Sequence, residues 1–335
     1  MKSIIAASLA ATLAMSVALP AHAQISNRTI TVSNGIAEEH PVGDGVAAMR
    51  ACYDEKTGGA WTLNAFWSSA LGDDLQATQA LRSGTQEMVI TSSSPIVGIV
   101  PALGVFDLPF LFANEAEADA ILDGEYGDYI SDMMPEYGLI NLAFWENGFR
   151  NLTNSLRPIQ SLEDFEGMRV RVMQNNIFLD TFQTLGTNAL PMAFGEVFSA
   201  LETRTIDAQE NPYVTIDTSQ FYEVQEYVSA TRHAYTPFMV LFSRAIWETY
   251  SAEEQQILVD CAIVGRDVQR EASRALSEES LARITEAGLQ HNEVPEEGLA
   301  EIRAAVQGVY DRHKDTIGAE VVDRMLAALE ELRAQ

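Results

Sequence analysis

Short apolar or alternating segments recur along the chain, separated by longer stretches in which apolar residues follow helical spacing. This alternation of strand and helix patterns predicts an α/β protein. We expect strands at residues 29–33, 62–66, 88–91, 140–145, 168–172, 205–209 and 238–242.

Two of the expected helices carry start signals. Asp44 precedes residues 45–56, and Asp73 precedes residues 75–82. A carboxylate in that position can accept hydrogen bonds from the free N–H groups of the first helical turn. Gly84 follows the second segment and is typical of a helix end. The sequence therefore predicts two capped helices in the first third of the chain.

The chain becomes more helical after Ser251. Residues 252–287 predict one long, charged, amphipathic helix or two helices in series, and residues 297–313 and 317–332 predict two more. No segment rich in Gly, Pro or Ser separates two independent domains. A protein with two lobes would therefore have to cross between them more than once.

The N-terminus has the pattern of an export signal. Lys2 gives a positive start, residues 4–19 are apolar, and Ala-His-Ala at residues 21–23 is a small-x-small cleavage site. The alternative is an uncleaved anchor, but a run of about sixteen residues is short for a span of roughly twenty. We expect residues 1–23 to be a cleaved signal peptide and the protein to work in the periplasm.

The composition narrows the class of partner. The formal net charge is −27, and acidic residues are spread along the chain rather than gathered in a tail. Such a surface argues against nucleic acid and against an anionic membrane surface as partners. An apolar content of 47% is enough for the core of one large domain or of two lobes.

The two cysteines, Cys52 and Cys261, are far apart in the sequence. In an oxidising compartment they can form one disulfide, and the alternative is a pair of buried free thiols. A lone pair at this separation does not have the spacing of a metal site.

The motifs of secreted enzymes are missing from the sequence. It contains no G-x-S-x-G, H-E-x-x-H, G-x-x-x-x-G-K or G-x-G-x-x-G pattern. The histidines at 40, 233, 291 and 313 do not have metal-ligand spacing, so we expect them on the surface or in packing roles. We expect no enzyme activity, no metal site and no cofactor.

The segment G-M-R-V-R-V contains a candidate anion-binding residue. On a strand at residues 168–172, Arg169 and Arg171 share one face, and Arg171 lies next to the carboxyl end. Ligands of open α/β sheets bind outside those ends. A guanidinium matches a carboxylate with two parallel hydrogen bonds, which makes Arg171 a candidate carboxylate ligand. The alternative is an ion pair with one of the many acidic side chains.

Two further residues have competing interpretations. Asn211 stands between an expected strand and Pro212, so its amide can point into a crevice, or it can cap a helix that begins near Tyr213. Phe194 lies in a turn that leads into a helix. Its ring can form a crevice wall or a hydrophobic staple.

Taken together, these segments resemble the solute-binding proteins of tripartite ATP-independent periplasmic (TRAP) transporters, of the dicarboxylate-binding type. The resemblance covers nearly the whole chain after the expected leader, and its ordered combination of blocks is specific. The blocks are His-Pro at 40–41, T-G-G at 57–59, L-G-D-D at 71–74, D-L-P-F-L-F at 107–112, W-E-N-G-F-R-N-L-T-N at 145–154, G-M-R-V-R-V at 167–172, L-G-T-N-A-L-P-M-A-F-G-E-V-F-S-A-L at 185–201 and I-D-A-Q-E-N-P at 206–212.

This resemblance implies a two-lobed periplasmic binding protein, similar to type II, with crossing hinge strands and a long helix that spans both lobes. Lobe I would comprise residues 24–148 plus about 238–276, and lobe II residues 149–237 plus about 277–335. The implied protein is a monomer that captures a small organic acid anion by lobe closure. It would deliver this cargo to the small and large membrane subunits of a TRAP transporter, without a cofactor.

The resemblance also assigns roles in the site. Arg171 would form the main salt bridge to the carboxylate, and Arg150 and Asn211 would add contacts. Further candidates around the pocket are Asn34, Ser92, Phe194, His40 and Asn147.

The sequence departs from the family pattern at two positions. Ala208 replaces a glycine of the usual D-G-x-E-N-P block, which puts the local backbone geometry in question. Ser92 lies in the segment where relatives that bind sialic acid carry a glutamate, so sialic acid is disfavoured.

The ligand is left open between hexuronates, aldonates and C4-dicarboxylates, and the polar candidates favour a hydroxylated sugar acid. Two alternative functions are a module that presents its ligand to a sensor kinase, and an exported lyase or hydrolase of acidic sugars.

Overall fold

The computed structural model describes residues 25–334, so the expected signal peptide at residues 1–23 lies outside the described residues. Within this range the strands form one mixed, nine-stranded sheet, in the order β2-β1-β3-β8-β4-β7-β5-β6 with β9 beside β8. No helix of the described part is long and apolar enough to span a membrane. The strands are β1 (Arg28–Asn34), β2 (Trp61–Phe66), β3 (Met88–Ser92), β4 (Leu139–Asn154), β5 (Arg169–Val172), β6 (Asn188–Pro191), β7 (Ala208–Asn211), β8 (Tyr227–Ser243) and β9 (Gln290–Glu293).

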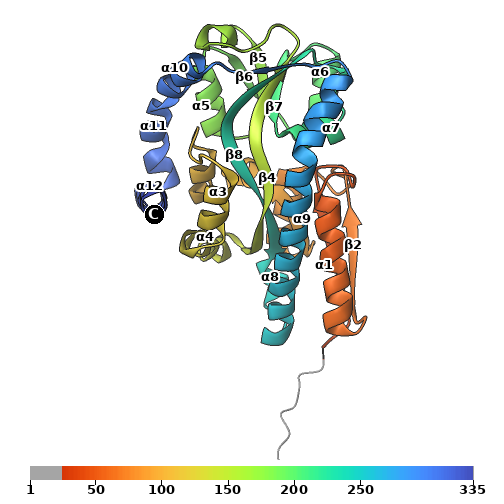
Figure 1. Ribbon diagram of the computed structural model, residues 1–335. Coiled ribbons are helices and arrows are strands. Elements are labelled where there is room, and N and C mark those ends of the chain that lie inside the picture. Colours follow the sequence, from red (N-terminus) through yellow and green to blue (C-terminus); the bar gives the residue numbers. More distant parts are fainter. Residues whose placement is uncertain (1–24, 335) are drawn as a thin grey trace, which may run out of the picture.

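Two long antiparallel strands, β4 and β8, join the halves of this sheet (Figure 1). They pair from Leu139 opposite Ser243 to Asn154 opposite Tyr227. One end of the pair borders β3 and the other borders β7. The first lobe therefore surrounds β1, β2 and β3, the second surrounds β5, β6 and β7, and the chain crosses between them on β4 and β8. This confirms the expected fold class.

The expected strands at 140–145 and 238–242 were too short. Strand β4 has 16 residues and β8 has 17. The hydrophobic pattern of β4 ends at Trp145 because Glu146 and Asn147 follow, yet every residue of β4 from Leu142 onward is buried. Buried polar side chains can continue a strand when they find partners inside the protein. The same effect extends β7 two residues beyond the expected end at 209, and the strand begins three residues later than expected.

The helix starts show one correct prediction and one error. Asp73 caps α2 in a capping box with Gln76, as expected. Helix α1, however, begins at Val42 rather than after Asp44, which lies in its first turn. The ring Nδ1 of His40 accepts the N–H of Val42 at 3.3 Å, so an imidazole supplies an acceptor at this helix start. The helices are α1 (Val42–Thr57), α2 (Asp74–Ser83), α3 (Glu115–Leu122), α4 (Glu125–Ser131), α5 (Asn176–Thr184), α6 (Val197–Glu202), α7 (Tyr213–Thr218), α8 (Arg244–Trp247), α9 (Ala252–Glu286), α10 (Glu296–Val306), α11 (Gly308–Ile317) and α12 (Ala319–Arg333).

Helix α9 is one continuous helix of 35 residues, about 50 Å long at 1.5 Å per residue. It begins beside α1, passes β4 and ends beside α7, so it spans both lobes (Figure 1). The close packing needs two glycines, because a Cβ on Gly45 or Gly265 would lie 2.5 Å from the ring of Trp145. The indole N–H of Trp145 donates to the carbonyl of Ala262 at 2.9 Å and fixes the strand against the helix.

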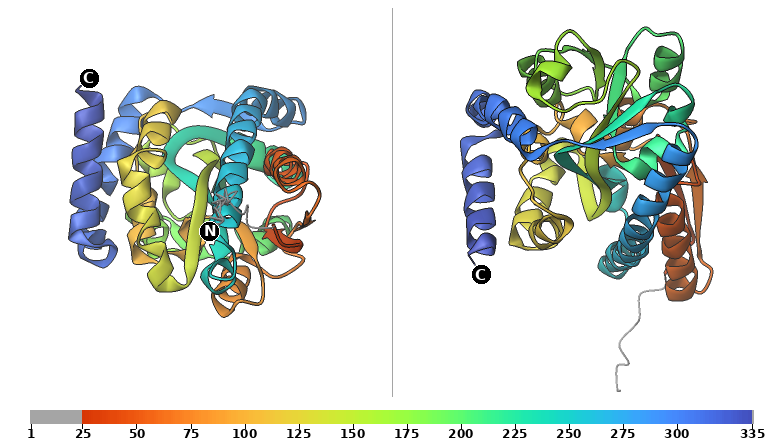
Figure 2. Two further views of the ribbon diagram at one scale, coloured as in Figure 1. Left: turned by 90° about the horizontal axis from the view of Figure 1, so that it is seen from below. Right: turned by 45° about the horizontal axis from the view of Figure 1, so that its top comes forward.

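The C-terminal helices run down the side of the molecule from the second lobe to the first (Figure 2). The expected helix at 297–313 is divided into α10 and α11 at Gln307. Helix α12 packs against α3 and α4, where the Tyr126 hydroxyl donates to the carbonyl of Val321 at 2.8 Å and Arg333 pairs with Glu117 at 2.8 Å. The two lobes are therefore also linked outside the crossing strands.

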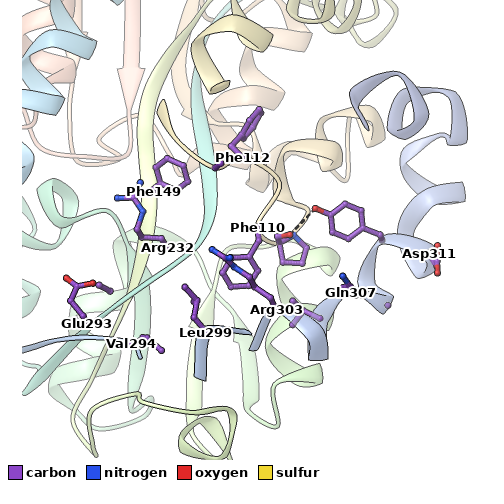
Figure 3. A pocket seen from close by; sticks show the side chains of 16 residues that line it. Phe110, Phe112, Phe149, Arg232, Glu293, Val294, Leu299, Arg303, Gln307 and Asp311 are labelled. Atoms are coloured by element: carbon purple, nitrogen blue, oxygen red, sulfur yellow. Dashed lines mark hydrogen bonds between the residues drawn. The ribbon is translucent and has the colours of Figure 1, made fainter. Parts of the chain in front are cut away.

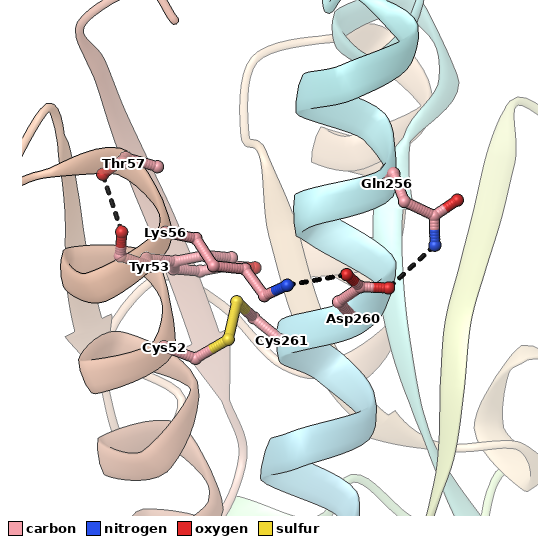
Figure 4. The surroundings of a disulfide bond; sticks show 7 residues. All are labelled: Cys52, Tyr53, Lys56, Thr57, Gln256, Asp260 and Cys261. Carbon is pink, nitrogen blue, oxygen red and sulfur yellow. Dashed lines mark hydrogen bonds and ion pairs between the residues drawn. A yellow bond between two sulfur atoms is a disulfide. The ribbon is translucent and has the colours of Figure 1, made fainter.

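Cys52 of α1 and Cys261 of α9 form a disulfide inside the first lobe (Figure 4). Both side chains are buried in the hydrophobic cluster that also contains Trp145. The bridge therefore joins two helices that already pack face to face, and it makes no connection to the second lobe.

Candidate functional site

A narrow cavity with a volume of about 40 Å³ lies where the carboxyl ends of β3 and β5 face each other beside the crossing strand β4. Its walls come from both lobes. Seven of the eight residues named from the sequence line it: Asn34, Ser92, Asn147, Arg150, Arg171, Phe194 and Asn211. The eighth, His40, lies behind the wall.

Four polar atoms around this cavity are buried and have no hydrogen-bond partner among residues 25–334. They are Asn34 Nδ2, Ser92 Oγ, Asn147 Oδ1 and Arg171 Nη1. Buried polar groups are almost always paired, because an unpaired one costs about 1 to 3 kcal/mol. Four such atoms in one cavity indicate a site for a polar molecule with both donors and acceptors.

Arg171 is the cation of this site. Its Nε and Nη2 donate to the carbonyl of Met192 at 3.0 and 2.7 Å, which fixes the guanidinium and directs Nη1 to the cavity. The side chain is 2% exposed, and within the described chain no carboxylate lies at ion-pair distance. Burial lowers the pKa of Arg171 to about 10, so it carries its charge at neutral pH.

Arg169 has the role that was the alternative for Arg171. It shares the face of β5 but lies at the edge of the protein, where Nη2 pairs with Asp207 at 2.5 Å. The Asp207 carboxylate raises the pKa of Arg169, and Arg169 lowers the pKa of Asp207. The interpretation of Arg171 as a surface ion pair was wrong, and it describes Arg169 instead.

Arg150 is fully buried, but its charge is already compensated. Its Nε and Nη2 bind the carboxylate of Glu210 at 2.5 and 2.9 Å. Burial alone would raise the pKa of Glu210, but Arg150 and a hydrogen bond from His233 hold it below the usual value. Arg150 therefore orients its neighbours more than it offers a free positive charge.

Asn211 is one of those neighbours. Its Oδ1 accepts from Arg150 Nη2 at 3.0 Å, and its Nδ2 donates to Gln209 Oε1 at 2.6 Å. Pro212 occupies the cap position of α7, so the interpretation of Asn211 as a helix cap was wrong. Ala208 is fully buried within β7 and pairs in normal register with Val170 and Asn154, so the strand does not need the glycine of relatives.

His40 connects the two lobes one layer behind the cavity. Its Nε2 lies 3.4 Å from the hydroxyl of Thr215, and its ring meets that of Phe238 edge to face. Both of these neighbours line the cavity. Burial lowers the pKa of His40 to about 3, so the ring is neutral. Because Nδ1 accepts from Val42, Nε2 carries the proton and donates to Thr215.

Asp74 is a lining residue that the sequence analysis did not identify. It is half-buried at the first position of α2, and its Oδ1 accepts from the Thr91 hydroxyl at 2.9 Å. Burial raises the pKa of Asp74, while Thr91 and Arg171 lower it. The L-G-D-D block could have revealed this residue, because a helix cap accounts for only one of its two aspartates. Asp73 caps the helix, and Asp74 turns to the cavity.

A much larger hollow of about 830 Å³ lies beside α10 and α11 (Figure 3). In it Arg232 stacks on Phe149 at 4.2 Å, and Arg303 stacks on Phe110 at 5.1 Å. Both arginines are exposed, and none of the buried atoms without partners in the described chain lines this hollow. The larger hollow therefore lacks the unsatisfied buried polar atoms that line the narrow cavity.

The chain matches known proteins over most of its length. Residues 32–316 match the family described as bacterial extracellular solute-binding protein, family 7. The 2,3-diketo-L-gulonate-binding periplasmic protein YiaO of Escherichia coli is 36% identical over 236 residues, which are 70% of this chain and 72% of that protein.

Solved structures agree with this match. The sugar acid binding protein of Advenella mimigardefordensis in complex with galactonate superimposes with a TM-score of 0.89 at 41% identity, covering 92% of this chain and 99% of that one. A TRAP periplasmic solute binding protein of Sulfurospirillum deleyianum with bound succinate gives a TM-score of 0.85 at 27% identity, covering 91% and 100% of the two chains.

Proposed function

The chain belongs to family 7 of the bacterial extracellular solute-binding proteins, and from that premise we propose that its cargo is a monocarboxylate sugar acid held by Arg171. It is a TRAP-type receptor for small organic acids. The finer proposal is that the acid carries several hydroxyl groups. The observation that supports it most is that the cavity contains one arginine without an ion-pair partner, Arg171, and also one carboxylate, Asp74.

The charges of the cavity favour one carboxylate in the ligand. Arg171 can receive it at Nη1, because no carboxylate of the described part of the chain lies at ion-pair distance from this guanidinium. Arg150 has its charge compensated by Glu210 and offers less to a second carboxylate. Asp74 would repel a second carboxylate, but it can accept hydrogen bonds from hydroxyl groups.

The remaining polar atoms suit a hydroxylated ligand. Asn34 Nδ2 can donate, Asn147 Oδ1 can accept, and Ser92 Oγ can do either. The relatives named above bind galactonate, 2,3-diketo-L-gulonate and succinate, so both sugar acids and a C4-dicarboxylate occur in this family. The more similar of the two solved structures holds the sugar acid.

We propose that capture occurs by closure of two lobes, residues 24–148 plus about 238–276 and residues 149–237 plus about 277–335. Movement would occur about β4 and β8, which are the crossing strands. Closure removes water, and the ion pair at Arg171 becomes stronger in the drier site. The closed receptor would work as a monomer in the periplasm and pass its cargo to separate membrane subunits of a TRAP transporter. We propose no turnover of the ligand.

Asp74→Asn should lower the affinity for a sugar acid such as galactonate or glucuronate by about ten- to a hundredfold, since a hydrogen bond to a charged group contributes about 1.5 to 3 kcal/mol. The same change should raise the affinity for succinate, because it removes a charge that repels the second carboxylate. Asparagine keeps the acceptor for Thr91, so the shape of the site is preserved. Isothermal titration calorimetry with the three ligands measures both effects.

Asp73→Asn is the matched control, because it changes the neighbouring acid and asparagine is an equally good helix cap. It should leave both affinities within about twofold. Tighter binding of succinate than of any sugar acid by the unchanged protein would contradict the proposal. Mass spectrometry of the ligand released from freshly purified protein would then name the acid.

A further inference from the structure

A buried polar cluster outside the cavity walls joins the two lobes. Asp107, at the end of the 3-10 helix η2 (Pro101–Asp107), accepts from the hydroxyl of Ser94 and from Asn175 Nδ2 at 2.5 Å. Asp107 and Ser94 belong to the first lobe and Asn175 to the second. All three are at least 95% buried, with exposures of 2%, 0% and 5%. Asp107 is the first residue of the D-L-P-F-L-F block, to which the proposed function gives no role.

The side chain of Asn175 is fully used by this cluster. Its Oδ1 accepts the N–H groups of Ile177 and Phe178 at 2.6 and 3.2 Å and caps α5. Its Nδ2 donates to Asp107 and to the carbonyl of Ser94, the latter at 3.1 Å. A flipped amide would oppose donors to donors and acceptors to acceptors. The orientation of Asn175 is therefore fixed, and one side chain binds a helix of its own lobe and a carboxylate of the other.

The cluster is directly connected to the ligand cavity on both sides. Ser94 is followed by Pro95, and Asn175 lies two residues after Met173; both Pro95 and Met173 line the cavity. The surrounding seam is tight, because a Cβ on Gly104 would lie 2.6 Å from the side chain of Ile177. In this seam the cluster is a polar contact whose groups can be hydrated again when the lobes separate.

We propose that Asp107 and Asn175 form a latch that stabilises the closed lobes over a bound acid, and that they are positioning residues acting through the segments at Pro95 and Met173. The inference rests on the proposed capture by lobe closure. It does not depend on which organic acid is bound, because neither residue lines the cavity.

The charge of Asp107 supports a contact that changes between open and closed states. Burial raises its pKa to about 7, the hydrogen bonds from Ser94 and Asn175 lower it, Arg150 lowers it and Glu210 raises it. His233 donates a hydrogen bond to Glu210 at 3.1 Å. In water an aspartate has a pKa near 3.9. Closure therefore takes up protons between about pH 4 and pH 7, and it is favoured more at about pH 6 than at about pH 8.

Exchange of the two groups tests the latch. Asn175→Asp keeps the cap of α5 but sets two carboxylates against each other, so ligand release measured by stopped flow should become about tenfold faster or more. In the double variant Asp107→Asn with Asn175→Asp, amide and carboxylate exchange places and their mutual hydrogen bond is restored. The carbonyl of Ser94 still loses its donor, so the release rate should return part of the way to that of the unchanged protein. Release at the unchanged rate in Asn175→Asp, or no recovery in the exchange, overturns the latch.

Asp107→Asn provides a second readout that a purely structural role would not change. The unchanged protein should bind more tightly at about pH 6 than at about pH 8, and Asp107→Asn should reduce this pH dependence. An identical pH profile in the two proteins contradicts the latch. Thermal unfolding midpoints show whether each variant is folded. If Asn175→Asp does not fold, the pH profile of Asp107→Asn alone tests the latch.

Galactonate and succinate are the two probes. Binding of succinate but not galactonate overturns the sugar-acid proposal and leaves the latch testable with succinate. Binding of galactonate with no effect of the latch variants overturns the latch alone. If the protein binds neither, the latch variants are tested with the acid that mass spectrometry identifies in freshly purified protein, and unchanged release of that acid overturns the latch.

Discussion

Replacement of Arg171 by alanine should lower the affinity for the ligand by at least about a hundredfold, the largest effect of any substitution in the site. The guanidinium is buried, carries its charge at neutral pH and has no acidic partner within residues 25–334. Loss of a charge-assisted carboxylate contact in such a place costs about 3 kcal/mol. Calorimetric titration with galactonate measures the loss, and thermal unfolding without ligand separates it from any loss of fold.

Lysine at position 171 should recover little of the affinity. Arg171 uses Nε and Nη2 to hold the carbonyl of Met192 and presents Nη1 to the cavity at the same time. A lysine has a single ammonium group and cannot do both with the same geometry. Strong binding by Arg171→Lys would show that charge alone, rather than the oriented fork, selects the ligand.

Arg169→Ala is the control for this prediction. The two arginines lie on the same face of β5, two residues apart, but Arg169 pairs with Asp207 and its side chain is 43% exposed. A surface ion pair of this kind contributes about 0 to 1 kcal/mol, so the affinity should change by less than about twofold. Equal losses in the two variants, or no loss in Arg171→Ala, would contradict the assignment of the carboxylate to Arg171.

Much of the fold was predictable because burial repeats at regular intervals. Apolar periodicity located β1, β2, β3 and α9, and Asp73 and Gly84 marked the ends of α2. The full length of the crossing strands was not predictable from the same pattern. Glu146 interrupts it, and only the fold brings Arg274 from α9 to within 2.6 Å of that carboxylate. In the sequence alone, a polar residue of this kind predicts a loop, because its buried partner is not yet known.

The site was predictable in its members and not in their charge state. Strand alternation placed Arg169 and Arg171 on one face. The two differ because Arg169 forms an ion pair with Asp207, which lies just before β7 and could not be assigned to it from the pattern of β5. The charge of Arg150 is compensated by Glu210, sixty residues later, through the pairing of β4 with β7. A resemblance therefore named three residues for the carboxylate end, and the ion pairs of the folded chain leave Arg171 as the uncompensated cation.

The negative net charge of the protein bears on how an anionic ligand reaches Arg171. A protein of charge −27 does not attract an organic anion by its overall field. Attraction must act at short range, inside the cavity, where the surface acids are screened by water and salt. The burial of Arg171 at 2% exposure provides that separation, because it keeps the cation away from the acidic side chains of the surface.

Replacement of both cysteines, Cys52→Ala with Cys261→Ala, should lower the free energy of unfolding by about 4 to 5 kcal/mol on the chain-entropy model. The two residues are 209 positions apart, so the bridge closes a long loop in the unfolded chain that contains residues 149–237 of the second lobe. Chemical denaturation of the oxidised protein and of the double variant measures the difference. The affinity for the ligand should stay within about twofold, because α1 and the part of α9 that carries Cys261 pack together inside one lobe.

Lys56→Ala tests whether the bridge or the helix contact supplies this stability. Lys56 and Asp260 join the same two helices beside the disulfide, at 2.8 Å and in an exposed position (Figure 4). Removal of that ion pair should cost less than about 1 kcal/mol, because water and salt screen it. If the double cysteine variant loses no more than Lys56→Ala, the stability comes from packing of α1 on α9 and not from restriction of the unfolded chain. If it also loses affinity, the bridge supports ligand binding as well as stability, and the expectation of an unchanged affinity is wrong.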